Sequence, residues 1–216
     1  MNAVLAIALT YLLGAVPFGL IISRLAGVGD IRKLGSGNIG ATNVWRVAGF
    51  KIAVWVFVAD IGKGALAVLM ARYFVPEPGL RPDHLYVICA AAAVLGHVFP
   101  VYLGFRGGKG VNTALGAIVA LLPVETLIGL GVFAVTVLLF RYVSLGSILG
   151  AISFCVVVVI EKFALKSPLE TIYVYLSILV AVLIVFTHRQ NIKRLSNGTE
   201  NRFSFSSRQT KETDRE

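Results

Sequence analysis

The stretch that decides the fold is residues 111–140, VNTALGAIVALLPVETLIGLGVFAVTVLLF. Its only charged side chain is Glu125, and its only proline is Pro123. Because about twenty apolar residues cross the hydrocarbon of a bilayer, the stretch could form one long kinked helix or two helices that separate at the proline. The choice sets how many times the chain crosses a membrane.

The composition of the whole chain is that of a membrane protein. Of its 216 residues, 57% are hydrophobic and only 14% are charged, and the mean hydropathy is +0.83. A soluble domain of this length needs more polar surface, and the short alternating segments of an outer-membrane barrel are absent. The sequence therefore predicts an all-α integral membrane protein. Its apolar runs predict spans at roughly 3–23, 52–72, 85–103, 111–122, 124–140, 144–161 and 170–187.

The distribution of lysine and arginine favours two helices within 111–140. With seven spans and the N-terminus outside, fifteen basic residues lie in inner loops and the tail, and four lie in outer loops. A single helix at 111–140 gives a nearly even split of nine against ten. Because cytoplasmic loops collect basic residues, we predict seven transmembrane helices, with the N-terminus outside and the C-terminus cytoplasmic. The fourth helix is then short, about 18 Å, and follows a glycine-rich loop.

The chain divides into a single polytopic domain, residues 1–194, and a polar tail, residues 195–216, which we expect to be flexible. The net charge of +9 is explained by membrane orientation, so we predict no nucleic-acid partner. Cys89 and Cys155 lie in apolar runs and are predicted to be buried free thiols. No grouping of metal-ligand residues is evident in the sequence, and we predict neither a metal nor a cofactor.

The first of three polar segments on the predicted cytoplasmic face is GSGNIGATNVWR, residues 35–46. Glycines let backbone amides approach a phosphate closely, and an arginine presents a fork that suits phosphate oxygens. No strand precedes the glycines, which excludes a dinucleotide-binding fold. The alternative is a tight turn between helices. The candidate substrate-binding residues here are Gly35, Ser36, Gly37, Asn38, Gly40, Thr42, Asn43 and Arg46.

The second segment is GFRGGKG, residues 104–110, just before the short fourth helix. It is not a Walker A loop, because a glycine stands where Ser or Thr would hold magnesium. Its bare amides, its lysine and the helix N-terminus would still favour an anion. The alternative is a flexible basic loop. The candidates from this segment are Gly107, Gly108, Lys109, Gly110 and Asn112.

The third segment is THRQNIKR, residues 187–194, in which His188 and Asn191 share one helix face. Ser144 begins a helix and either caps it or lines the same site. His97 ends the third span and is equally consistent with a functional residue and with a helix-end residue.

Asp60 and Lys63 lie three residues apart in the middle of the second span, where they can pair. Charged residues within a membrane usually have a function, although a structural ion pair that positions the first loop fits nearly as well.

Together these segments resemble the bacterial acyl-phosphate:glycerol-3-phosphate acyltransferase family over residues 1–195. The matching text is GSGNIGATNVWR (35–46), GHVFPVYLGFRGGKGVNT (96–113), RYVSLGS (141–147) and THRQNIKRL (187–195). The resemblance implies transfer of an acyl group from acyl phosphate to the sn-1 hydroxyl of glycerol 3-phosphate, an early step of phospholipid synthesis. The products would be 1-acyl-glycerol 3-phosphate (lysophosphatidic acid) and phosphate. It also implies the bacterial inner membrane, a membrane-lipid environment and a site that faces the cytoplasm.

The resemblance comes without the catalytic dyad of many other glycerolipid acyltransferases, a His with an Asp five residues later. In this sequence the residues five positions after His84, His97 and His188 are Cys89, Tyr102 and Lys193. We therefore expect no acyl-enzyme, and a phosphate oxygen of the acyl phosphate can take the proton from the attacking hydroxyl. Arg46 and Lys109 would contact phosphate.

Ser36 and His188 complete the predicted catalytic set by orienting the reactants. His188 as general base is the rival mechanism. The competing function is a transporter with a cytoplasm-facing site for an organic phosphate.

Overall fold

The computed structural model describes residues 3–74 and 78–203, and the regular structure in these ranges is entirely helical. The long apolar helices are α1 (Ala3–Ala15), α4 (Phe50–Ala71), α5 (Pro82–Val98), α7 (Pro123–Phe140), α8 (Val143–Phe163) and α9 (Thr171–Thr187). Shorter helices are α2 (Phe18–Leu25), α3 (Ala41–Ala48), α6 (Val111–Leu121) and α10 (Arg189–Ser196), with 3-10 turns η1 (Ile31–Lys33) and η2 (Val101–Leu103). The all-α prediction is confirmed for the described residues.

The bundle contains enough long apolar helices to cross a membrane several times. Four helical segments meet the length and hydropathy required, namely α4, α5 together with η2, α7 and α8. Counting the bent pairs α1–α2 and α9–α10 as one span each raises the number to six, and α6 is apolar but only 11 residues long. The count of seven spans and the orientation of the termini therefore stay predictions.

The stretch 111–140 forms two helices, as the charge pattern indicated. Helix α6 ends at Leu121 and α7 begins at Pro123, which occupies the first turn, where a proline costs no hydrogen bond. Helix α6 also packs closely on α4 through glycines. A Cβ on Gly64 would collide with the carbonyl oxygen of Thr113, and one on Gly116 with that of Ile61.

The first predicted span, 3–23, is not one continuous helix. It breaks between Ala15 and Phe18, and α1 and α2 meet at an angle of 41°. Pro17 explains the break, because proline lacks the amide hydrogen that would continue the helical ladder. The break leaves the carbonyl of Val16 to accept a hydrogen bond from the Lys63 ammonium, at 2.9 Å.

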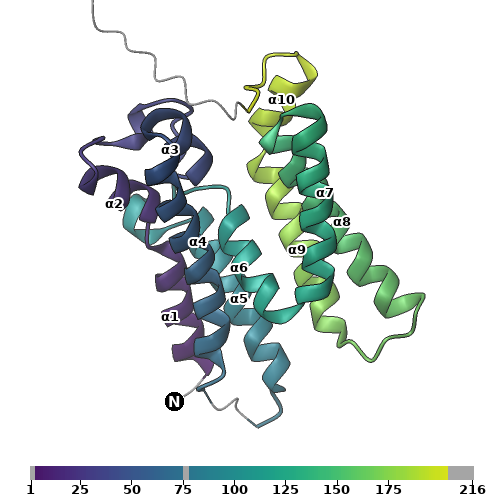
Figure 1. Ribbon diagram of the computed structural model, residues 1–216. Coiled ribbons are helices and arrows are strands. Elements are labelled where there is room, and N and C mark those ends of the chain that lie inside the picture. The colour runs from purple at the N-terminus through teal and green to yellow at the C-terminus, as the bar shows by residue number, and fades with distance from the viewer. Residues whose placement is uncertain (1–2, 75–77, 204–216) are drawn as a thin grey trace, which may run out of the picture.

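Two short helices lie outside the predicted spans. Helix α3 follows the first glycine-rich segment, and α10 follows α9 after a bend of 58°. Both lie at the same end of the bundle, opposite the N-terminal end of α1 (Figure 1). The three conspicuous segments of the sequence therefore meet at one end of the molecule, over a core of apolar side chains from α4, α5, α6, α8 and α9.

Candidate active site

A cavity of about 550 Å³ lies at this end of the bundle, between the two glycine-rich loops and the start of α10. That volume is typical of a site for a small organic ligand. All the candidate residues from the sequence line it except Gly35 and Gly37. The lining also includes apolar side chains, among them Phe57, Val111, Phe133, Val143 and Phe186.

Asn43 holds the first loop in shape. Its side-chain oxygen accepts the amide of Ser36 at 2.8 Å, and its nitrogen donates to the carbonyls of Asn38 at 2.8 Å and Leu34 at 3.1 Å. Because Asn43 is 2% exposed and its polar atoms are engaged, it shapes the loop. Its predicted substrate contact stays a prediction.

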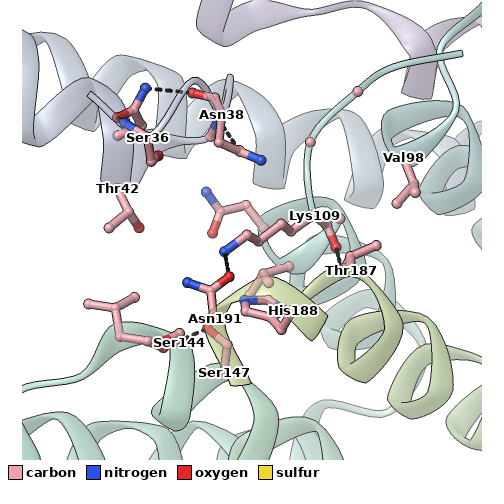
Figure 2. A pocket seen from close by; sticks show the side chains of 18 of the residues that line it. Ser36, Asn38, Thr42, Val98, Lys109, Ser144, Ser147, Thr187, His188 and Asn191 are labelled. Atoms are coloured by element: carbon pink, nitrogen blue, oxygen red, sulfur yellow. Dashed lines mark hydrogen bonds between the residues drawn. The ribbon is translucent and has the colours of Figure 1, made fainter. Parts of the chain in front are cut away.

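Asn38 and the glycines complete the same loop. The Asn38 side chain accepts the amide of Gly40 at 2.8 Å, while Gly35 and Gly37 adopt positive φ angles of 58° and 71° that side chains rarely tolerate. Ser36 and Thr42 line the cavity, and Figure 2 shows both across from Ser144 and Ser147.

The second loop uses its glycines differently from our expectation. We expected bare amides at Gly107 and Gly108 to contact phosphate, but these amides donate to the carbonyls of Val98 and His97, each at 3.1 Å. A Cβ on Gly107 would collide with the His97 carbonyl, and one on Gly108 with the His97 ring. These glycines therefore allow close packing, and the loop offers a ligand mainly the Lys109 side chain and the N-terminus of α6.

Lys109 points across the cavity to the third segment. Its ammonium donates to the side-chain oxygen of Asn191 at 2.5 Å, and its carbonyl accepts from the Thr187 hydroxyl at 3.1 Å (Figure 2). Burial lowers the pKa of Lys109 to about 8, with Glu200 acting to raise it and Arg194 and Arg46 to lower it further. Burial therefore disfavours the charged form of Lys109, and an anionic ligand beside it would stabilise that form.

The carboxylate of Glu200 organises the third segment, and the sequence did not reveal it. Ser144 donates to it at 2.8 Å, Asn191 at 2.6 Å and Arg194 at 2.7 Å. Burial opposes ionisation of Glu200, but these hydrogen bonds together keep its pKa below the ordinary value. The carboxylate is therefore charged near neutral pH.

The described part of the tail packs against the site. Residues 195–203 were expected to begin a flexible tail, but Glu200 is 7% exposed, and the Phe203 ring lies 4.8 Å from that of Trp45. The amide of Phe203 also donates to the carbonyl of Arg141 at 2.6 Å. A buried carboxylate that needs several donors explains this packing. Residues 204–216 of the predicted tail lie outside the described residues.

His188 caps the end of α9 and is 2% exposed. Its Nδ1 lies 2.8 Å from the carbonyl oxygen of Ile184, and a carbonyl can only accept, so Nδ1 carries the proton and Nε2 remains an acceptor. Burial, and then the charge of Lys109, lower the pKa of His188 to about 4. The imidazole is therefore neutral near pH 7.

Arg46 reaches the cavity from α3. No protein group within residues 3–74 and 78–203 accepts a hydrogen bond from its guanidinium. The positive charge of Arg46 nevertheless lowers the pKa of Lys109, so the two cations are close enough to act on the same part of the cavity. A guanidinium that faces a cavity beside an ammonium is suited to a phosphate.

Asp60 and Lys63 form the ion pair that the sequence allowed, with 2.9 Å between Nζ and Oδ1. His97, which was equally consistent with either role, is buried beside them, and both Asp60 and His97 line the cavity. The predicted free thiols are confirmed, with Cys89 buried and Cys155 half-buried. The described residues contain no group of His, Cys, Asp and Glu that could hold a metal.

A family model described as glycerol-3-phosphate acyltransferase matches residues 4–198 of the chain. Curated proteins of that name are similar along nearly their whole length. The protein of Chlorobium phaeobacteroides is 40% identical over 94% of this chain and 97% of its own. The protein of Syntrophotalea carbinolica is 46% identical over 89% and 93%.

Two solved structures are also similar. Both are crystal structures of PlsY (YgiH), an integral membrane glycerol 3-phosphate acyltransferase. The glycerol 3-phosphate form has a TM-score of 0.83 and 38% identity, and the match covers 94% of this chain and 96% of that one. The lysophosphatidic acid form has a TM-score of 0.81 and 37% identity over 94% and 95%.

Proposed function

The chain belongs to the glycerol-3-phosphate acyltransferase family, and we propose that its acyl donor is an acyl phosphate and that no acyl-enzyme forms. As a multi-pass membrane acyltransferase it acylates glycerol 3-phosphate to give lysophosphatidic acid. The proposal extends to the sn-1 hydroxyl as acceptor, to the bacterial inner membrane, and to a site that faces the cytoplasm.

One observation carries the proposal, namely that Arg46 on α3 and Lys109 on the second loop reach the same cavity from segments far apart in the sequence. Both proposed substrates carry a phosphate, and one also carries a fatty chain. The two cations suit the phosphates, and the phenylalanines and valines of the lining suit the chain. A site of this kind joins a water-soluble acceptor to a donor that remains in the lipid.

The proposed mechanism requires the protein to position charge rather than to form a bond. The hydroxyl oxygen of glycerol 3-phosphate attacks the carbonyl carbon, the bond from that carbon to the bridging phosphate oxygen breaks, and an ester forms. The hydroxyl proton passes to an oxygen of the departing phosphate. Lys109 and Arg46 stabilise the negative charge that gathers on that phosphate, and Ser36 and Thr42 orient the acceptor.

The geometry of His188 favours this substrate-assisted proton transfer over the rival in which His188 is the base. A neutral imidazole with a pKa of about 4 is a weak base at neutral pH, whereas its Nε2 can accept a hydrogen bond from a substrate hydroxyl. His188→Gln supplies a side chain that can still hydrogen-bond. We expect it to keep most of its turnover, and a loss of several orders of magnitude in kcat with binding intact would establish the base instead.

The direct test is the reaction itself. Purified protein in detergent, given glycerol 3-phosphate and palmitoyl phosphate, should release inorganic phosphate and form lysophosphatidic acid, and palmitoyl-CoA should not replace the donor. Absence of product with palmitoyl phosphate but formation with palmitoyl-CoA would overturn the proposed donor. Uptake of glycerol 3-phosphate into liposomes without acylation would instead support the transporter that the sequence left open.

A further inference from the structure

A buried polar cluster adjoins the second glycine-rich loop and the helix that packs on the first, and the mechanism above does not use it. It consists of Lys63 and Asp60 on α4, His97 at the end of α5 and Thr113 in the first turn of α6. The Lys63, Asp60 and His97 side chains are 4% exposed or less, and Thr113 is fully buried. Charged groups this buried need close partners to offset the cost of removing them from water.

On one side the cluster holds the helix that supports the first loop. The Lys63 ammonium donates to the carbonyl of Val16 at 2.9 Å, at the break between α1 and α2, and it also lies over the ring of Phe18 at 5.6 Å. Helix α2 in turn packs on the first loop so closely that a Cβ on Gly19 would collide with the carbonyl of Ile39. Lys63 therefore influences where residues 35–40 lie.

On the other side the cluster holds the second loop. Asp60 Oδ1 lies 3.6 Å from His97 Nδ1, and the same nitrogen lies 3.1 Å from the Thr113 hydroxyl. The opposite edge of the His97 ring lies against Gly108, and its carbonyl accepts the Gly108 amide. Lys109 follows Gly108 in the chain, so the His97 ring packs against the stretch of backbone that carries the Lys109 side chain.

From this geometry we propose that Asp60, Lys63 and His97 form a positioning unit that sets the distance between the two loops and hence between Arg46 and Lys109. The three residues need not touch the reacting atoms. Lys63 holds the helix under one loop, His97 supports the other, and Asp60 joins them. The inference rests on the proposed function for its kinetic readout, but the loop distance can be measured without any turnover.

The kinetic test uses three substitutions at one position. His97→Asn retains a polar group near the position of Nδ1, which faces Asp60 and Thr113, His97→Gln retains one near Nε2, and His97→Ala retains neither. We expect His97→Ala to raise the KM of glycerol 3-phosphate or of palmitoyl phosphate at least about tenfold, which corresponds to about 1.4 kcal/mol of binding. His97→Asn should recover most of that loss and His97→Gln should not.

The control for a merely structural role lies at the opposite end of the bundle. Tyr173→Phe removes a hydrogen bond of 3.1 Å to Asp83 that joins α9 to α5. It should lower the thermal unfolding midpoint without changing either KM. His97→Asn should change the midpoint no more than this control does, so that its kinetics report on a folded enzyme.

The structural test measures the two loops directly. Spin labels at the exposed positions Leu34 and Tyr102, with Cys89 and Cys155 replaced, report the distance across the site. Asp60→Asn/Lys63→Gln removes both charges together and so avoids leaving one buried charge unpaired. We expect a shifted or broadened distance distribution for this double variant and an unchanged one for Tyr173→Phe.

Two results would overturn the inference. One is an active His97→Gln beside an inactive His97→Asn, which would assign a direct chemical role to Nε2. The other is a wild-type KM in His97→Ala together with an unchanged loop distance in the double variant. If the wild type is inactive with palmitoyl phosphate, the proposed donor fails, while the loop distance still decides the positioning role.

Discussion

The two glycine-rich loops look alike in the sequence but are built in different ways. The loop at residues 35–40 is held by side chains from its own neighbourhood, chiefly Asn43, which bonds to Ser36, Asn38 and Leu34. The loop at residues 104–110 is held by the preceding helix end and by Thr187 and Asn191, which follow about eighty residues later. The loop at residues 35–40 is therefore held by local contacts, and the loop at residues 104–110 depends on contacts with segments distant in the sequence.

This difference has a consequence for function. A locally built loop can keep its form even if the helices shift, whereas a loop held by distant segments reports on whether the bundle is assembled. Lys109 can face a ligand only when α5, α6 and α10 are in place, since His97, the α6 N-terminus and Asn191 all constrain it. Damage to the second loop should therefore appear mainly in catalysis, and damage to the first mainly in stability.

The largest expected effect is that of Lys109→Gln. The substitution removes the cation from the fold-dependent loop but keeps a side chain that can bond to Asn191. We expect kcat/KM to fall about 10³-fold, in the range seen when one charge-stabilising group is lost. Because burial already disfavours the charged form of Lys109, the thermal midpoint should not fall. Equal losses for Ser36→Ala would contradict the contrast between the loops.

Gly108→Ala should produce the next largest effect. The added methyl group would meet the His97 ring, and the ring or the loop must move, so we expect kcat/KM to fall about 10- to 100-fold because a small misplacement at a reacting site is costly. Gly62→Ala is the matched control, since nothing lies within 4 Å of a Cβ there. The same steady-state assay should find the kcat/KM of Gly62→Ala close to that of the wild type. A wild-type kcat/KM in Gly108→Ala would show that the close packing has no functional role.

Asn43→Ala should affect the first loop in the opposite way, through stability. It leaves the Ser36 amide and the Asn38 carbonyl without their partner, and an unsatisfied buried polar group costs about 1–3 kcal/mol. For a chain of this size that corresponds to a fall in the unfolding midpoint of roughly 2–12 °C. Differential scanning fluorimetry in detergent measures the fall. A wild-type midpoint with severely reduced turnover would reverse the assignment of the two loops.

Local chemistry explains what the sequence could predict. Hydropathy and charge placed most helices within a few residues, and Pro123 correctly separated α6 from α7. Arg46, Lys109 and His188 were brought to one cavity as expected, because the positive-inside pattern assigned their segments to one face. The proline rule also explains the break at Pro17, although the apolar run 3–23 hid it.

The features that the sequence did not predict depend on distant contacts. Glu200 stands in a polar stretch that is typical of a flexible tail, and only its packing against Ser144, Asn191 and Arg194 reveals it as a buried centre. The amides of Gly107 and Gly108 could not be known to be occupied, because their acceptors belong to the fold of the preceding helix end. A GG pair has the same sequence whether it binds an anion or packs under a histidine.

The smallest and most specific effect concerns pH and tests whether Glu200 tunes the second loop. Lys109, with a pKa of about 8, is charged below that pH and loses its charge above it. Activity that needs the cation should therefore fall as the pH rises through about 8. The carboxylate of Glu200 raises the pKa of Lys109, so Glu200→Gln should move the falling limb of kcat/KM to lower pH.

The measurement is a profile of kcat/KM for glycerol 3-phosphate from pH 6 to 10, because this parameter reports on the free enzyme. Glu125→Gln is the control, since Glu125 lies in the first turn of α7 at the far end of the bundle, and its profile should match that of the wild type. In Lys109→Arg the falling limb should disappear, because a guanidinium stays charged throughout this range. If the limb persists in Lys109→Arg, another group causes it, and the second loop is not the pH-sensitive part of the site.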